Sequence, residues 1–463
     1  MMKRMKELWM LLILTFIGII IASCSSDDSS DDGGSDTGST DIIAPVATDA
    51  TNVSTNGFTA NWNSVFGAAS YQLDVSSKED FSTLLEGYDG RSVTAFTIDI
   101  EGLDDNVQYY YKVRAIRGDD TSMDSNIISV KTDLEVSEEI SLKTEANFLV
   151  GVAVSENRVG NTLYDEVYTK EFNSLTAEND MKMRSIFKNL DASNNIVYDW
   201  TAADGIVNYA DANDMNVHGH TLIWHRSIPD ALQNFAGSNE EFENIIEQYI
   251  KAVLTRYKGK IDSWDVVNEA IDDDENIQWR NTLFFEKMGP NYVEKCFAFA
   301  RAADPDVKLF YNDYNMTFDD VKRGKVLALV DDLKVENLID GVGYQMHIDH
   351  NFPPKGDIQK ATDQLLAKDL LIHFAELDVK LNAAGDLTEL TPQRAEDQKQ
   401  KVKEVVEIFN ALPAKNQYAL TLWGLKDNDS WIPGEYGRPD WPLLFDRNFE
   451  RKPAYDGFIE GLQ

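Results

Sequence analysis

Cysteine and basic residues are scarce in this sequence. Only two cysteines, Cys24 and Cys296, occur in 463 residues, so a disulfide framework is excluded. We interpret Cys296 as a small buried hydrophobic residue of an amphipathic helix. Lysine and arginine total 43 against 79 aspartates and glutamates, which gives a formal charge of −36. This negative charge repels nucleic acid and anionic lipid headgroups, so we expect a neutral substrate and no nucleic-acid partner.

Long apolar runs are also scarce. The run from Leu8 to Ile21 is too short for a comfortable transmembrane helix. Basic residues precede it at Lys3, Arg4 and Lys6, and this arrangement is typical of a secretory signal. We therefore expect the chain to be exported.

The end of that run resembles a bacterial lipobox, with the residues Ile21-Ala22-Ser23-Cys24. The resemblance implies a signal peptide over residues 1–23 and lipidation of Cys24, which would anchor the protein to the bacterial membrane. We expect the outer membrane, facing the cell exterior. A cleaved signal with an incidental cysteine is the alternative. Residues 24–41 are almost entirely Ser, Asp, Gly and Thr, a composition that predicts a disordered tether.

Residues 42–133 show short alternating strands separated by Gly, Asn and Asp, which predicts a small all-β sandwich. This segment resembles a fibronectin type III domain: Trp62 matches its early core tryptophan, and Leu103 with Tyr109 matches its corner tyrosine. We interpret the module as a spacer. Its aromatic side chains could bind carbohydrate, but we expect Trp62, Tyr71 and Tyr109 to lie in the core. The predicted strands are Gly57–Trp62, Ala69–Val75, Val93–Ile98, Tyr109–Ile116 and Asn126–Lys131.

Residues 134–463 alternate apolar strand-like runs with helical patterns. The clearest helical stripe extends from Phe242 to Tyr257, with a capping box from Ser238 to Glu241 before it. Eight such alternations predict an α/β fold, the (β/α)8 barrel. The runs are Phe148–Val154, Phe172–Thr176, Val217–Trp224, Ile261–Val267, Val307–Tyr311, Gly341–Gln345, Leu370–Ala375 and Tyr418–Trp423.

Two of these runs end on a glutamate. Glu269 follows the fourth run and Glu376 follows the seventh. The carboxyl ends of barrel strands meet on one face, so the two carboxylates can face each other across one pocket. Two facing carboxylates are the groups that cleave a glycosidic bond.

Seven strand-end motifs resemble glycoside hydrolase family 10, the retaining xylanases, and they occur in the order typical of that family. They are TAENDMK from Thr176, GHTLIWH from Gly219, WDVVNEA from Trp264, NDYN from Asn312, GYQMHI from Gly343, AELD from Ala375 and LWGLKDNDSW from Leu422. The resemblance implies Glu269 as general acid/base and Glu376 as nucleophile.

The resemblance also implies supporting roles. His347 would bridge Glu376 and Asp378, Asn268 would donate to a sugar 2-hydroxyl, and Gln345 would contact the acid/base. The implied substrate-binding residues are Glu178, Asn179, Lys182, His220, Trp224, Tyr314, Asn315, Trp423 and Trp431.

Three positions depart from the family pattern: Met183, Ser227 and Ala231. We expect these substitutions to touch the sugar-binding rim and to leave the chemistry unchanged. A zinc site formed by His218, His220 and His225 is an alternative interpretation of the histidine cluster, although no cysteine or acidic ligand follows at metal spacing.

These observations lead to one main hypothesis: a monomeric, surface-anchored endo-1,4-β-xylanase that acts on xylan and xylo-oligosaccharides without a metal or organic cofactor. Two alternatives remain open. One is a lipoprotein that binds xylan without hydrolysing it. The other is a retaining barrel glycosidase that acts on another β-glycan, because several families share the two-glutamate framework.

Overall fold

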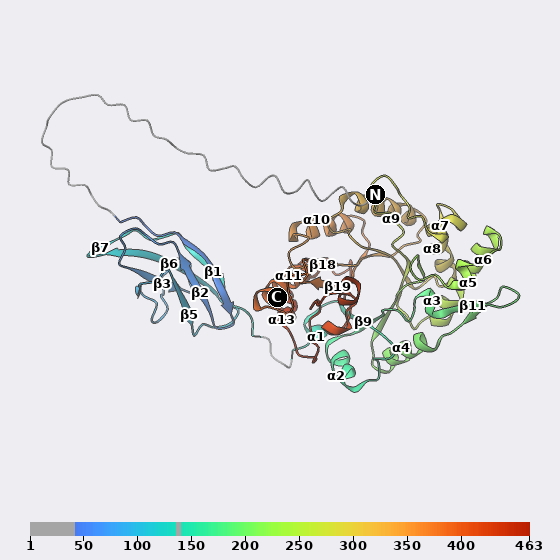
Figure 1. The fold of residues 1–463 in the computed structure, drawn as a ribbon, viewed down its shortest axis with the longest axis horizontal. Coiled ribbons are helices and arrows are strands. Elements are labelled where there is room, and N and C mark those ends of the chain that lie inside the picture. The colour runs from blue at the N-terminus through green and yellow to red at the C-terminus, as the bar shows by residue number, and fades with distance from the viewer. Residues whose placement is uncertain (1–41, 136–139) are drawn as a thin grey trace, which may run out of the picture. The chain divides into compact units, whose positions relative to one another are not determined.

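The computed structural model describes residues 42–135 and 140–463. The chain divides into two compact units, Met1–Asp133 and Leu134–Gln463 (Figure 1). The predicted signal peptide, Cys24 and the tether lie outside the described residues. Within the described ranges, no helix is both long and apolar enough to cross a membrane.

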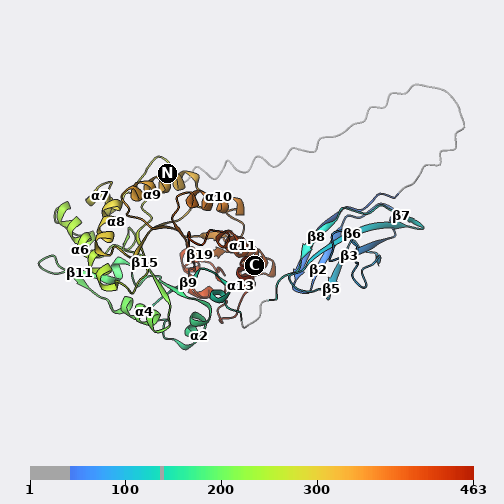
Figure 2. The same ribbon diagram turned by 180° about the vertical axis from the view of Figure 1, so that it is seen from behind.

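The first unit contains two antiparallel sheets. One has the strand order β1-β2-β5, and the other has β4-β3-β6-β7 with β8 also paired to β6 (Figure 2). The predicted run Val93–Ile98 is wrong as a single strand, because the chain passes there from β4 in one sheet to β5 in the other. The strands are β1 Ala47–Ser54, β2 Gly57–Trp62, β3 Ser70–Ser76, β4 Arg91–Val93, β5 Thr97–Glu101, β6 Gln108–Arg117, β7 Asp120–Thr121 and β8 Ile128–Lys131.

Aromatic residues form much of the core of this unit. Trp62 packs edge-on against Tyr71, with 5.6 Å between ring centroids. Tyr109 is buried, and its hydroxyl accepts a hydrogen bond from the Asp104 backbone N–H at 3.1 Å. All three rings are at most 4% exposed. The expectation that they belong to the core is confirmed, and their faces are not available to a sugar.

The second unit contains a closed barrel of eight parallel strand positions, which confirms the predicted (β/α)8 fold. Neighbouring strands pair in the order β9, β10, β13, β15, β16, β17, β19 and β20, and β20 pairs with β9 to close the ring. Two short strands, β14 and β18, add to β15 and β19. The strands are β9 Leu149–Val154, β10 Ser174–Ala177, β13 Asn216–Gly219, β14 Ile223–Trp224, β15 Ser263–Asn268, β16 Lys308–Asp313, β17 Gly341–Tyr344, β18 His347–Asp349, β19 Leu371–Lys380 and β20 Gln417–Leu422.

Two predicted strands differ from the structure. The run Val217–Trp224 is not continuous, because β13 ends at Gly219 and β14 begins only at Ile223. The run Leu370–Ala375 is too short, because β19 continues to Lys380 through the pairing of its second half with β18. Glu376 therefore lies within a strand rather than at its end.

Helices surround the barrel. The helix α6 begins with the predicted capping box, in which the Ser238 hydroxyl accepts the Glu241 N–H and the Glu241 carboxylate accepts the Ser238 N–H. The longer helices are α2 Thr162–Glu171, α4 Thr201–Ala212, α6 Asn239–Tyr257, α8 Tyr292–Ala303, α9 Asp320–Val335, α10 Lys355–Leu366, α11 Pro392–Asn410 and α13 Pro453–Gly461. Shorter elements are α1 Leu142–Glu145, α3 Met183–Ile186, β11 Phe187–Leu190, β12 Ile196–Tyr198, α5 Asp230–Gln233, α7 Leu283–Met288, the 3₁₀ turn Asp427–Asp429 and α12 Ile432–Tyr436.

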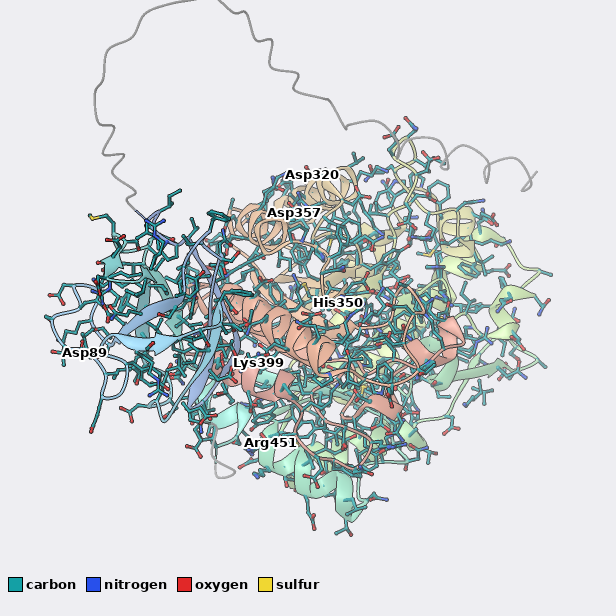
Figure 3. The ribbon with its side chains drawn as sticks, turned by 60° about the vertical axis from the view of Figure 1, so that its left-hand side comes forward. Asp89, Asp320, His350, Asp357, Lys399 and Arg451 are labelled. Atoms are coloured by element: carbon teal, nitrogen blue, oxygen red, sulfur yellow. The ribbon has the colours of Figure 1, made fainter. Side chains whose placement is uncertain are left out.

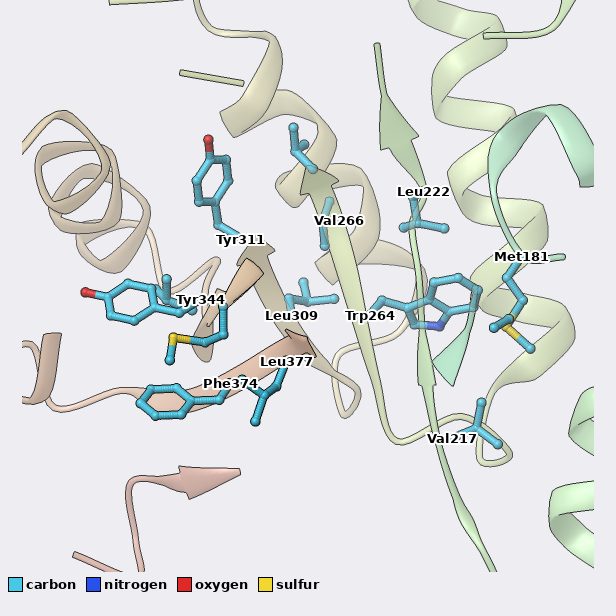
Figure 4. Close-up of a cluster of buried hydrophobic side chains, with 14 of the residues drawn as sticks. Met181, Val217, Leu222, Trp264, Val266, Leu309, Tyr311, Tyr344, Phe374 and Leu377 are labelled. Carbon is cyan, nitrogen blue, oxygen red and sulfur yellow. The ribbon is translucent and has the colours of Figure 1, made fainter. Parts of the chain in front are cut away.

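The C-terminal segment pairs with helices from two parts of the barrel domain. Lys399 on α11 pairs with Glu460 on α13 at 2.9 Å, and Arg451, just before α13, pairs with Glu171 on α2 at 2.9 Å. Lys399 and Arg451 are labelled in Figure 3. Both acidic partners are buried, so these pairs are largely shielded from solvent. Figure 4 shows part of the apolar packing between strands and helices, with Trp264 among the side chains.

The end of the barrel at which the strands begin is tightly packed at Gly341, the first residue of β17. A Cβ atom on Gly341 would lie 2.2 Å from Cε1 of the buried Phe310 ring. We expect Gly341→Ala to lower the free energy of unfolding by about 1–3 kcal/mol, because the ring has no free space to enter. Urea unfolding measures this change.

A matched control is Gly324→Ala, within α9, where a Cβ would meet no atom within 4 Å. Alanine is the better helix former, so we expect this control to raise the free energy of unfolding by about 0.5–1 kcal/mol. Equal stability of Gly341→Ala and the unaltered chain would contradict the packing argument.

Candidate active site

A cleft of about 680 Å³ lies at the carboxyl ends of the barrel strands. Its lining includes all of the sequence-predicted catalytic and substrate-binding residues, together with Asn268, Gln345 and His347. Asp378 is 1% exposed and does not line the cleft itself, but it contacts His347 and Trp431, which do. The side chains come from or follow β10, β13, β14, β15, β16, β17, β19 and β20.

Glu269 follows β15 directly, and its backbone is unusual. Its φ is +58°, in the left-handed region that non-glycine residues rarely adopt. Its N–H donates to the Asn312 carbonyl at 3.0 Å, which holds this turn against β16. The carboxylate Oε1 accepts from Gln345 Nε2 at 2.9 Å and from Asn268 Nδ2 at 3.3 Å, while Oε2 accepts from Trp224 Nε1 at 2.9 Å.

Glu376 has a different set of partners. Its Oε1 accepts from Asn312 Nδ2 at 2.6 Å, and its Oε2 lies 3.2 Å from His347 Nε2. The other imidazole nitrogen, Nδ1, lies 2.9 Å from Asp378 Oδ2, which also accepts from Trp431 Nε1 at 2.9 Å. His347 thus bridges two buried carboxylates that lie two residues apart on β19.

Asn312 connects the two glutamates. Its backbone carbonyl fixes the turn that carries Glu269, and its side chain donates to Glu376. No role was predicted for this asparagine, although the NDYN motif begins with it. Because the buried Asn312 contacts the backbone of Glu269 and the carboxylate of Glu376, the two glutamates lie near the end of β16 within the same cleft.

His347 carries a positive charge at neutral pH. Burial alone would lower its pKa, but Asp378 and Glu376 outweigh that effect and raise the pKa to about 10. His347 thus places a cation in direct contact with both carboxylates of β19.

Aromatic side chains form one wall of the cleft. His220 meets Trp423 edge-on at 5.3 Å between centroids, and Asp265 Oδ2 lies 2.9 Å from His220 Nδ1. That contact orients the His220 ring so that its other nitrogen faces away from Asp265. The indoles of Trp224, Trp423 and Trp431 present flat apolar surface, which suits the apolar faces of pyranose rings.

The three histidines considered for zinc do not share one site. His218 is buried and lies 2.6 Å from Ser263 Oγ, whereas His220 and His225 line the cleft. The break between β13 and β14 produces this arrangement. In residues 42–135 and 140–463, no group of three or more His, Cys, Asp or Glu side chains is placed to hold a metal ion.

A polar region lies where Glu178, Asn179 and Lys182 line the cleft. Lys182 Nζ donates to Asn179 Oδ1 at 3.1 Å and lies 4.6 Å from the Trp224 ring centroid. Burial lowers the pKa of Lys182, and the charges of Glu376, Glu178 and Glu269 oppose this effect. Burial also raises the pKa of Glu178.

Tyr314 is held rigidly beside the acid/base candidate. Its hydroxyl accepts from Arg280 Nη2 at 2.7 Å and donates to Asp273 Oδ2 at 2.5 Å. Lys322 Nζ lies 3.4 Å from the centre of its ring. These contacts fix the position of Tyr314 before a sugar binds.

Five further lining residues were not predicted from the sequence, because they lie outside the strand-end motifs or have no distinctive spacing. They are Arg226, Arg280, Lys380, Glu435 and Tyr436. The expectation that the positions of Met183, Ser227 and Ala231 touch the sugar-binding rim is wrong for Met183 and Ala231. Met183 is fully buried and Ala231 packs against the core, whereas Ser227 lines a smaller hollow that adjoins the cleft.

The pKa of His347 predicts a pH-dependent contribution to stability. The folded-state value of about 10 lies above the ordinary 6.5, so this contribution is complete below pH 6.5 and is lost as pH rises to about 10. The His347→Gln variant has no titratable group at this position. The difference between its free energy of unfolding and that of the unaltered chain should therefore shrink by roughly 2–4 kcal/mol as the pH rises from about 6.5 to about 10. Denaturant unfolding at several pH values measures it, and a pH-independent difference would mean that His347 folds as the neutral form.

Comparison with known proteins agrees with this geometry. The model of glycosyl hydrolase family 10 matches residues 139–461. The chain is 37% identical over 346 residues to endo-beta-1,4-xylanase Xyn10C of Cellvibrio japonicus, covering 68% of this chain and 56% of that protein. It is 35% identical over 377 residues to endo-1,4-beta-xylanase A of Thermotoga maritima, covering 79% of this chain and 34% of that protein. The chain thus spans about half or less of the length of these relatives.

Solved structures agree as well. The fold is similar to xylanase XynB from Paenibacillus barcinonensis, with a TM-score of 0.65, 34% identity and coverage of 70% of this chain and 99% of that one. It is equally similar to xylanase 10B from Thermotoga maritima, with a TM-score of 0.65, 34% identity and coverage of 70% and 98%. The chain belongs to glycosyl hydrolase family 10.

Proposed function

We propose that this protein is a retaining endo-1,4-β-xylanase that hydrolyses internal β-1,4-xylosidic bonds. The observation that carries the proposal is the pair of glutamates in one cleft, each held by different partners and both supported by Asn312. The relatives in the previous section are named as xylanases, which supports xylan and xylo-oligosaccharides as substrates. The reaction uses no metal or organic cofactor.

In the first step, Glu376 attacks the anomeric carbon. The Asn312 amide and the charged His347 hold its carboxylate in place. As the glycosidic bond breaks, Glu269 gives its proton to the leaving oxygen, and a covalent glycosyl-enzyme ester forms. Tyr314 lines the side of the cleft that holds the leaving group.

In the second step, water hydrolyses the glycosyl-enzyme ester. The negative charge of Glu376 is gone in the intermediate, so the ionised form of Glu269 is no longer opposed by a nearby anion. Glu269 takes a proton from water, the hydroxide oxygen bonds to the anomeric carbon, and Glu376 leaves as carboxylate. Two displacements give retention of configuration.

The two alternatives make different predictions from this one. A lipoprotein that only binds xylan would release no reducing ends, and the intact supports of both glutamates argue against it. A glycosidase for another β-glycan would act better on cellulose or mannan than on xylan. Reducing-end release from the three purified polysaccharides separates these possibilities.

Single substitutions of the two glutamates distinguish their roles. Glu376→Ala should lower turnover of xylan by about 10⁴-fold or more, because no covalent intermediate can form, while oligosaccharide binding persists. Near-normal turnover would exclude Glu376 as nucleophile.

Glu269→Ala should lower xylan turnover by roughly 10²–10⁴-fold, the usual contribution of an acid/base group. An aryl xylobioside has a leaving group that needs no proton, so its first step should be largely preserved in this variant. A pre-steady-state burst of released phenol provides the measurement. Equal losses on xylan and on the aryl glycoside would contradict the role of Glu269 as acid.

We also propose that the first unit is a fibronectin type III-like spacer and that the protein is an exported, monomeric lipoprotein of the outer membrane. Two antiparallel sheets over one aromatic core and the hydrogen bond to the Tyr109 hydroxyl support the spacer. The basic residues, apolar run and lipobox-like residues that end at Cys24 support the anchor.

Cys24→Ser tests the anchor. A thioether-linked lipid requires the cysteine sulfur, so this variant should lose incorporation of labelled fatty acid and move out of the membrane fraction. Cys296→Ser is the matched control, because Cys296 is fully buried and should not carry lipid. Unchanged labelling of Cys24→Ser would exclude lipidation at that residue.

A further inference from the structure

A second hollow of about 270 Å³ adjoins the cleft. The two cavities share Asn179, Lys182, Trp224 and Arg226 in their linings, so a group attached to a sugar in the cleft can enter the hollow. The hollow has room for a sugar-sized side group.

The charge of this hollow is opposite to that of the chain as a whole. Its lining contains the cations Lys182, Arg184 and Arg226, and none of its described lining residues is acidic. The whole sequence has 79 acidic residues against 43 basic ones. Carboxylates outside the hollow act on two of these cations: Glu376, Glu178 and Glu269 on Lys182, and Asp230 on Arg184 at 3.9 Å. The lining itself contains only cations and neutral residues, so the hollow is a positively lined region on an acidic protein.

Arg226 and Arg184 make few hydrogen bonds and ion pairs with the rest of the protein. Arg226 lies 5.7 Å from the Trp224 ring centroid, and no ion pair of Arg226 occurs in the described ranges. Arg184 donates to the Ile228 carbonyl at 2.8 Å, and its Nη2 lies 3.9 Å from Asp230, whose side chain is 87% exposed and lies outside the hollow. Hydrogen-bonding capacity of both guanidinium groups remains free for a ligand.

Ser227 keeps the hollow open. It is one of the positions at which the chain departs from the family pattern, and its short side chain lines the hollow. Its hydroxyl accepts the Arg184 backbone N–H at 3.4 Å, so Ser227 lies close to the cationic side chains without filling the space.

We propose that this hollow binds the carboxylate of a uronic acid side group on xylan. The inference rests on the proposed function and adds a substrate preference to it. A guanidinium group matches a carboxylate geometrically and electrostatically, and Arg226 and Arg184 offer two such groups at the edge of the glycan cleft. A xylan chain with few uronic acid side groups gains these contacts, whereas a dense polyanion is repelled by the rest of the acidic surface.

The test uses two xylo-oligosaccharides of the same length that carry either a glucuronic acid side group or the same side group with its carboxyl reduced to an alcohol. Calorimetry on the full chain with Glu376→Ala, which prevents cleavage, gives the ratio of their affinities. The acidic ligand should bind about three- to tenfold more tightly at low salt, and this preference should weaken as salt increases.

Arg226→Gln and Arg184→Gln should each reduce the preference by about two- to fivefold, and the double variant should remove it. Lys188→Gln is the matched control, because this exposed cation on β11 pairs with Asp199 at 3.8 Å and does not line the hollow. The control should keep the full preference.

Two results would overturn the carboxylate site: equal affinity for the acidic and reduced ligands in the starting chain, or a preference that survives loss of both arginines. Failure of the proposed function is distinguishable from these results. A chain that releases no reducing ends from unbranched xylan but retains the preference in binding would lose its enzymatic assignment and keep the carboxylate site.

Discussion

The double contact of Asn312 is the interaction on which the site depends. Its carbonyl accepts the Glu269 N–H at 3.0 Å and its amide donates to Glu376 at 2.6 Å. Glu269 has a backbone conformation that costs free energy, so surrounding contacts must impose it. The strand β16 supplies that constraint because Asn268 and Asn312 are paired in the sheet. The pairing of β15 with β16 thus positions Glu269, and the Asn312 side chain holds the Glu376 carboxylate beside the same strand end.

Electrostatics then makes the two glutamates different. Glu376 contacts a charged imidazole, which is itself balanced by Asp378, whereas Glu269 contacts neutral donors from Gln345, Asn268 and Trp224. The two side chains therefore lie in different hydrogen-bond environments, and the proposed mechanism requires two carboxyl groups in unlike environments.

The sequence predicted the barrel because parallel strands that are covered on both faces must be apolar throughout, and those runs are visible without a structure. It also indicated Glu269 and Glu376, because polar residues directly after or within such runs are conspicuous. Continuous apolarity could not reveal the break between Gly219 and Ile223, since a buried non-strand segment has the same composition as a strand. The same limit applies to β19, whose extension depends on pairing with β18. The role of Asn312 depends on which neighbour each of its atoms meets, and no spacing encodes that.

Net charge is a poor guide to the charge of a cleft. The value of −36 predicts repulsion of dense polyanions, yet Lys182, Arg226 and Arg280 line the same cleft as the two catalytic candidates. A cleft that contains Glu178, Glu269 and Glu376 requires nearby cations to limit their mutual repulsion, and the loops that follow the strands supply them. Past the last glutamate lie Arg226, which forms no ion pair among the described residues, and Arg184, whose contact with the exposed Asp230 is long at 3.9 Å. The need to stabilise a group of carboxylates in the protein thus produces, at the edge of that group, a surface suited to a carboxylate on the substrate.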